Sequence, residues 1–129
     1  MVTRMSQRNY VLVAEDDQDC AAVYADALEV VGFDAVITGT GQEALDTVEL
    51  YAPCAVILDR GMRLADGSDL LEALLATGRI EVHRLLVITG GPIEGCRAKA
   101  IRKPATADDV WDHVRDCCAP KLDARDALA

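Results

Sequence analysis

The chain has 129 residues, of which 51% are hydrophobic and 27% are charged, as expected for one globular domain with a single core. Its formal net charge of -9 argues against binding to nucleic acid, which requires a basic surface. No apolar run approaches the ~20 residues that cross a membrane, and the polar start of the chain does not resemble a secretory signal. We therefore expect a cytoplasmic protein that does not enter the membrane.

Two kinds of segment alternate along the chain. Short continuous apolar runs predict strands that are buried on both faces of a parallel sheet, and apolar residues at helical spacing predict amphipathic helices. In chain order we predict a strand at 10–14, a helix through Tyr24, Leu28 and Val31, a strand at 35–37, a helix through Ala44, Leu45, Val48 and Tyr51, a strand at 55–58, a helix through Leu70, Leu71, Leu74 and Leu75, a strand at 85–88, a weaker strand at 98–102 and a helix through Val110, Trp111 and Val114. This alternation indicates an open α/β sheet with helices on both faces.

Several residues are typical of helix ends. Asp17 is favourable near the N-terminus of the first helix, and Thr106 with Asp109 fits a capping box at the start of the last one. Gly32 and Gly78 occupy positions where helices commonly stop.

The fourth and fifth predicted strands are unusually close in sequence. Only about eight residues, 90–97, separate them, and these include Pro92 and several glycines. A parallel crossover normally needs a dozen residues or more, most often a helix. We therefore expect the helix between these strands to be absent or reduced to a loop. Part of one sheet face should then be uncovered, which favours a homodimer or a docked partner.

Polar residues follow four of the predicted strands. In open α/β sheets, ligands bind outside the carboxyl ends of the strands, so these side chains should meet at one edge. They are Glu15, Asp16 and Asp17 after the first strand, Asp59 after the third, Thr89 and Gly90 after the fourth, and Lys103 after the fifth.

This set of residues favours phosphoryl chemistry with a metal ion. Crowded carboxylates repel one another, and a divalent cation with hard oxygen ligands, such as Mg2+, removes that repulsion. A carboxylate can also act as a nucleophile and form an aspartyl-phosphate. An ammonium group, a hydroxyl and a backbone N–H would then stabilise the charge on the phosphoryl oxygens.

The ordered motifs resemble the response regulator receiver (CheY-like) family of two-component phosphorelay systems. Each motif alone is weak, but together they cover about residues 9 to 118 in the right order and at strand ends. The motifs are Glu15-Asp16-Asp17, Asp59 with Met62, Asp66-Gly67, Thr89-Gly90 and Lys103-Pro104.

The resemblance implies a flavodoxin-like, doubly wound, five-stranded parallel sheet of order 2-1-3-4-5, with a receiver domain at 9–118 and a C-terminal tail at 119–129. It implies that Asp59 accepts the phosphoryl group and binds Mg2+ together with Asp16, the backbone carbonyl of Gly61 and, mainly through water, Glu15. Thr89, the backbone of Gly90 and Lys103 would contact the phosphoryl group. The donor would be a sensor histidine kinase or a histidine phosphotransfer protein, so the chain would be a switch or shuttle rather than an ordinary enzyme.

Other interpretations stay open. The chain could be a stand-alone regulator, which its Met1 and short tail favour, a receiver module of a hybrid histidine kinase, or a scaffold of the same fold that is not phosphorylated.

Two local patterns depart from the family. The aromatic switch residue usual in the family is replaced by Ala100. Residues 39–44 also match the dinucleotide pattern G-x-G-x-x-A, although the acidic residues at 15–17 would repel a pyrophosphate.

The cysteines and histidines do not indicate a further site. The five cysteines form no C-x-x-C pair and no metal spacing, so we expect free thiols that mostly fill the core. The adjacent Cys117 and Cys118 are poorly placed for a disulfide with each other. We interpret His83 and His113 as surface residues.

Overall fold

A five-stranded parallel sheet forms the centre of the molecule. The computed structural model describes residues 10–118, so residue 9 of the predicted domain and the predicted tail at 119–129 lie outside the described residues. The strands are β1 (Tyr10–Ala14), β2 (Asp34–Thr38), β3 (Ala55–Asp59), β4 (Leu85–Thr89) and β5 (Lys99–Arg102), in the order β2-β1-β3-β4-β5. This order confirms the predicted flavodoxin-like fold.

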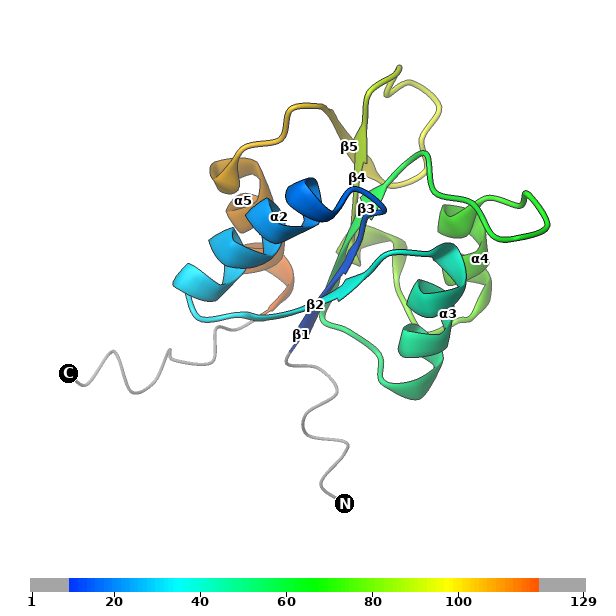
Figure 1. Cartoon of the computed structure of the whole chain (residues 1–129), viewed down its shortest axis with the longest axis horizontal. Helices are drawn as coiled ribbons and strands as arrows, with labels where there is room; N and C mark the ends of the chain where they lie inside the picture. Colours follow the sequence, from blue (N-terminus) through cyan, green and yellow to red (C-terminus); the bar gives the residue numbers. More distant parts are fainter. Residues whose placement is uncertain (1–9, 119–129) are drawn as a thin grey trace.

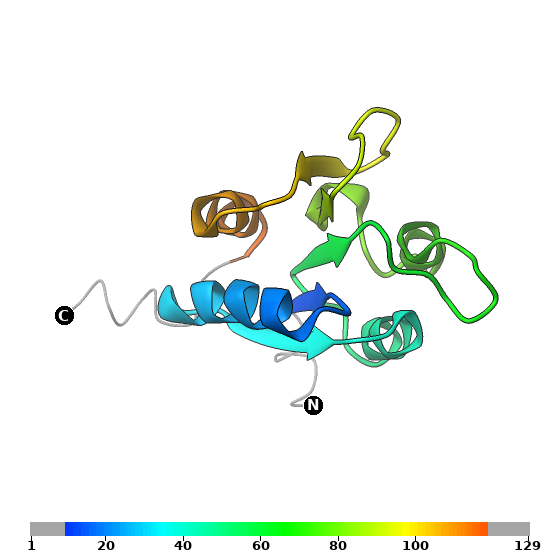
Figure 2. The ribbon, with the colours of Figure 1, turned by 45° about the horizontal axis from the view of Figure 1, so that its top comes forward.

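The helices form one layer on each face of the sheet. Helices α2 (Gln18–Val30) and α5 (Ala107–Cys117) cover one face, and α3 (Gly41–Leu50) and α4 (Leu70–Ala76) cover the other (Figures 1 and 2). A short 3-10 helix, η1 (Val82–Arg84), leads into β4. Within residues 10–118, no helix is both long enough and apolar enough to span a bilayer.

The predicted helix ends are confirmed. The side chain of Asp17 caps α2 by accepting hydrogen bonds from the backbone N–H groups of Asp19 and Cys20. Thr106 and Asp109 form the reciprocal capping box at the start of α5. Gly32 follows α2 with a φ of 95°, a left-handed conformation that glycine adopts without steric cost.

The apolar residues of the three central strands are all buried, as their continuous apolar sequences predict. Alternate residues of β1, β3 and β4 point into two separate core clusters, one beneath α3 and α4 and one beneath α2 and α5. The prediction is wrong for β2, where Val36 and Ile37 are 39% and 47% exposed. Among residues 10–118, strand β2 pairs only with β1, and an edge strand is covered less completely than a central one.

No helix forms between β4 and β5, which confirms the prediction from the length of this segment. Residues 90–98 run as an extended loop between the two strands (Figure 1). The expected uncovered face is nevertheless wrong for β4, because all five of its residues are buried. Cys96 and Ala98 at the end of the loop pack into the cluster that contains Leu74, and Arg97 forms an ion pair with Glu72 of α4. The loop itself therefore closes the core.

Two further expectations are corrected by the structure. His113 is only 3% exposed, because its ring packs under η1 with Nε2 2.9 Å from the carbonyl oxygen of Arg84, whereas His83 is exposed as expected. Cys54 and Cys118 form a disulfide, so the cysteines are not all free thiols. Residues 64 positions apart are joined here, a pairing that no local spacing in the sequence can indicate.

We predict that Gly41→Ala destabilises the protein by about 1–3 kcal/mol, a typical cost of forcing extra atoms into a packed site. A Cβ at this first residue of α3 would lie 2.7 Å from the backbone carbonyl oxygen of Arg63. The matched control is Gly39→Ala, where a Cβ would meet nothing within 4 Å. Urea unfolding of the parent and both variants checks this, and equal losses in the two variants would contradict it.

Candidate functional site

Three carboxylates gather at the carboxyl edge of the sheet. Glu15 follows β1, Asp16 comes next in the chain, and Asp59 is the last residue of β3. Each offers an oxygen within 4.8 Å of the others. Their surroundings differ, because Glu15 is buried, Asp59 is half-buried and Asp16 is exposed. The cluster thus has an accessible side, which Asp16 and Asp59 face.

Lys103 supplies a positive charge to this cluster. Its Nζ lies 3.6 Å from Oδ1 of Asp59 and 3.9 Å from Oε1 of Glu15. Burial opposes the charged ammonium form, but the two carboxylates outweigh that effect and raise the pKa of Lys103 above its usual range. Its backbone N–H donates to the carbonyl oxygen of Thr89 at 2.8 Å, which ties the residue after β5 to the end of β4.

Glu15 is the least satisfied group of the site. Its Oε2 accepts a hydrogen bond from the backbone N–H of Asp17 at 3.2 Å, but its Oε1 is buried without a hydrogen-bond partner among residues 10–118. Burial raises the pKa of Glu15 to about 7; the hydrogen bond from Asp17 opposes this rise and the charge of Asp59 adds to it. The buried oxygen of Glu15 receives no hydrogen bond, and two further carboxylates lie beside it. Such a group of oxygen ligands fits a hard divalent cation such as Mg2+.

The other predicted residues lie around Asp59. The backbone N–H of Gly61 donates to Oδ1 of Asp59 at 3.1 Å. Asp59 pairs with Ile88 in the register between β3 and β4, so Thr89 is the next residue along the neighbouring strand. Thr89 is buried, and its Oγ1 accepts a hydrogen bond from the backbone N–H of Gly91 at 3.0 Å. The hydroxyl proton therefore stays available for a ligand at this edge.

Of the two remaining motif residues, Gly90 lies at the edge of the site and Asp66 does not. Gly90 directly follows β4 and is exposed, so its backbone is accessible at the same edge. Asp66 does not join the acidic cluster; it organises its own turn by accepting hydrogen bonds from the backbone and hydroxyl of Ser68. These bonds lower the pKa of Asp66. Its motif is therefore a loop feature rather than a part of the site.

Cys20 also lies at this edge, although the sequence analysis did not assign it to the site. It lies in the first turn of α2 and, together with Lys103 and Pro104, lines an apolar pocket of about 270 Å³. Burial raises the pKa of the Cys20 thiol, and the acidic neighbours led by Asp17 raise it further. Its position three residues after the N-cap of a helix that begins at the site was the available signal.

The comparisons with known proteins agree on the architecture. No family model and no curated protein sequence matches the chain. Among solved structures, the receiver domain of Francisella response regulator 1452 matches with a TM-score of 0.71 and 22% identity, over 85% of this chain and 96% of that one. The chemotaxis protein CheY4 of Vibrio cholerae matches with a TM-score of 0.72 and 16% identity, over 85% and 98% of the two chains.

A third match extends over more of this chain. The CheY-like response regulator receiver domain protein from Methanospirillum hungatei has a TM-score of 0.68 and 20% identity, over 95% of this chain and 99% of that one. The sheet order and the helix layers agree with these matches, which cover 85% to 95% of this chain. The chain therefore has the fold of the response regulator receiver domains.

Proposed function

We propose that this chain is a phosphorylatable signalling module in which Asp59 accepts a phosphoryl group in the presence of Mg2+. The proposal rests mainly on the acidic cluster, in which carboxylate oxygens of Glu15, Asp16 and Asp59 lie within 4.8 Å of one another. Nζ of Lys103 lies 3.6 Å from Oδ1 of Asp59, the proposed acceptor. A receiver fold supports a signalling role, and the chain is then a switch or shuttle rather than an ordinary enzyme.

The reaction is a transfer from nitrogen to oxygen. A carboxylate oxygen of Asp59 attacks the phosphorus of a phosphohistidine, the P–N bond breaks, and the imidazole nitrogen leaves with the electron pair and is protonated by solvent. Lys103 would offset the negative charge of the phosphoryl oxygens, and the Thr89 hydroxyl and the backbone N–H of Gly90 would donate hydrogen bonds to them. No step requires a general base, because a carboxylate, unlike a hydroxyl, has no proton to lose when it attacks.

The residues that would hold Mg2+ are Asp16 and Asp59 through their carboxylates, Gly61 through its carbonyl and Glu15 mainly through water. When bound, the ion neutralises the carboxylates and polarises the phosphoryl oxygens. The hydrogen-bond vacancy at Oε1 of Glu15 supports this assignment, because a water ligand of the ion can donate to it.

The proposed donor is a sensor histidine kinase or a histidine phosphotransfer protein. The exposed side of the cluster and an adjoining pocket of about 270 Å³, lined by Asp16, Gly61 and Arg63 among others, leave room for the donor's imidazole. A cytoplasmic location, a homodimer and the lack of nucleic-acid binding stay predictions, as does the choice between a stand-alone regulator and a module of a hybrid kinase.

We predict that acetyl phosphate and Mg2+ add one phosphoryl group to the parent protein and none to Asp59→Asn. Intact mass spectrometry measures the adduct, and omission of Mg2+ should abolish it. The matched control is Asp66→Asn, which removes an acidic residue from the neighbouring loop and should be phosphorylated like the parent. If the parent gains no phosphoryl group and also fails to bind beryllofluoride, the proposal is wrong and the scaffold interpretation replaces it.

We predict that stability without Mg2+ falls as pH rises from about 4.5 to about 7, the usual and the raised pKa of Glu15. In this window the folded state holds more protons than the unfolded state, so a rise in pH favours unfolding. Thermal unfolding across the window measures this, and Glu15→Gln should remove this component of the slope.

The same proton should compete with the metal ion. Mg2+ should therefore raise the melting temperature more at roughly one unit above the pKa of Glu15 than at one unit below it. In Glu15→Gln that difference should disappear. An equal effect of Mg2+ at both pH values in the parent would argue against a metal site beside Glu15.

We predict that Gly61→Ala slows the loss of the phosphoryl group by about fivefold, equivalent to about 1 kcal/mol in the barrier. A Cβ here would lie 3.7 Å from Oδ1 of Asp59, an ordinary contact that fits without strain and covers the acceptor from water. The decay of the phosphorylated mass after removal of the donor gives the rate. Gly39→Ala is the control, and an unchanged or faster decay in Gly61→Ala would contradict the prediction.

A further inference from the structure

Two cysteines meet at the end of the sheet opposite to the acidic cluster. Cys54 lies just before β3 and Cys118 just after α5, and their sulfur atoms form the disulfide. Asp59 ends the same strand that Cys54 precedes, so about 16 Å of extended chain separates the disulfide from the proposed phosphoacceptor. The disulfide is therefore a feature separate from the candidate site.

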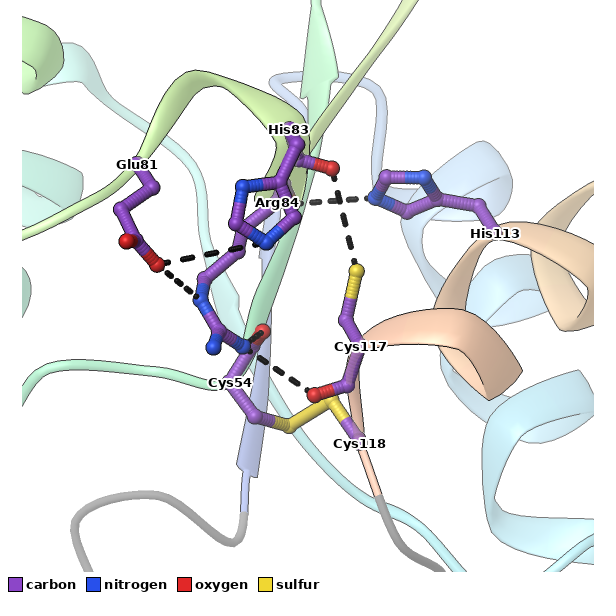
Figure 3. A network of polar contacts seen from close by, with 7 residues as sticks. All are labelled: Cys54, Glu81, His83, Arg84, His113, Cys117 and Cys118. Carbon is purple, nitrogen blue, oxygen red and sulfur yellow. Dashed lines mark hydrogen bonds and ion pairs between the residues drawn. A yellow bond between two sulfur atoms is a disulfide. The ribbon is translucent and has the colours of Figure 1, made fainter.

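Arg84 holds both cysteine-bearing segments without using their sulfur atoms. Its Nη1 donates to the carbonyl oxygen of Cys54 at 2.9 Å and to that of Cys117 at 3.1 Å (Figure 3). Its Nε donates to Glu81 at 3.0 Å, which fixes the guanidinium. These bonds end on backbone oxygens, so they do not require the disulfide and can hold the two segments together without it.

The buried His113 strengthens the same junction. Its Nε2 donates to the carbonyl oxygen of Arg84 at 2.9 Å, since a carbonyl can only accept, and this bond ties the last turns of α5 to η1 (Figure 3). Burial lowers the pKa of His113, which favours the neutral ring. The end of α5 is thus held to Arg84 by contacts of both His113 and Cys117.

The reduced form has a place for its buried thiol. Sγ of Cys54 lies 3.3 Å from the carbonyl oxygen of Tyr10, and the sulfur can donate a hydrogen there only as a thiol. The side chain is otherwise enclosed, since Cys54 is 3% exposed. A thiol at Cys54 would therefore find a hydrogen-bond acceptor already in place in this buried position.

We propose that Cys54 and Cys118 form a reversible dithiol–disulfide pair that fastens the end of α5 to the start of β3, with a low-molecular-weight disulfide such as glutathione disulfide as oxidant. The thiolate of Cys118, the more exposed of the two, attacks one sulfur of glutathione disulfide and releases one glutathione thiolate. The thiolate of Cys54 then attacks Sγ of Cys118 and releases the second. The two protein thiols lose two protons and two electrons, and glutathione disulfide is reduced to two thiols.

The neighbouring Cys117 does not compete for this bond. It is half-buried, and its Sγ points to the carbonyl oxygen of His83 at 3.8 Å (Figure 3). Burial raises the pKa of the Cys117 thiol despite the nearby charge of Arg84, so little of it is thiolate, the form that attacks disulfides. The structure thereby selects one of two adjacent cysteines.

The test counts the free thiols of the whole chain. The protein is reduced with dithiothreitol, freed of reductant, incubated with glutathione disulfide, quenched in acid, and alkylated under denaturing conditions with N-ethylmaleimide before intact mass spectrometry. The chain has five cysteines, so the reduced protein should carry five adducts. The oxidised protein should carry three, because five cysteines less the two in the bond leave three. Renewed dithiothreitol under native conditions should restore five.

Two serine variants of adjacent residues identify the pair. Cys118→Ser should carry no intramolecular disulfide after oxidation, whereas its matched control Cys117→Ser should still lose two thiols and show the Cys54–Cys118 link in a peptide map. Five free thiols in the parent after oxidation, or an internal disulfide in Cys118→Ser, would overturn the proposal. So would a disulfide in the folded parent that dithiothreitol does not open.

A second readout tests whether the bond fastens α5. Oxidation should raise the melting temperature by about 10 °C, as expected for a bond that closes a long loop. It should also slow amide hydrogen exchange in the last turn of α5, and neither change should occur in Cys118→Ser. Equal melting temperatures and equal exchange in the two states of the parent would show that the bond does not fasten α5.

Discussion

The parallel register of the central strands is the constraint on which the candidate site depends. Ala14 pairs with Leu58 between β1 and β3, and Asp59 pairs with Ile88 between β3 and β4. All strands run in the same direction, so the residues that follow them emerge at one edge. A slip of one residue would turn the apolar side chains of a strand to the wrong face and carry Asp59 away from its neighbours. Core packing and site geometry are therefore specified by the same register.

That edge concentrates negative charge at a cost to stability. Glu15 is held in a buried position beside Asp59, with one oxygen lacking a hydrogen-bond donor, and the resulting rise in its pKa reflects how unfavourable the ionised form is. Lys103 offsets part of the charge from a distance of 3.6 Å to Asp59. Strain of this kind is common where a site is organised for a ligand, and here a divalent cation is the ligand that would relieve it.

The two ends of β3 have different roles. At one end the strand presents Asp59 to solvent, and at the other Cys54 joins it to α5 through the disulfide. The loop at 90–98 replaces the helix that the receiver family has at this place, because its residues Cys96 and Ala98 close the core. The surface near β5 accordingly carries small and charged residues, with Ala100 half-buried and Lys99 and Arg102 exposed.

Local patterns in the sequence are enough to predict the class of fold, the helix caps and the residues of the candidate site. Strand runs, the capping residues Asp17 and Thr106, and polar residues placed directly after strands are local patterns, so they can be recognised without a structure. The missing helix was predictable for the same reason, since the eight or so residues between two parallel strands leave too little chain for it.

The burial of a residue and its partners from distant parts of the chain depend on the tertiary structure and cannot be predicted from local patterns. The exposure of β2, the burial of His113, the orphan oxygen of Glu15 and the Cys54–Cys118 bond all depend on what packs against each residue. Those neighbours come from other elements, such as Arg84, which contacts segments 30 and 33 residues away. Periodicity in a sequence reports the direction of a side chain relative to its own helix or strand, but not which distant segment lies opposite to it.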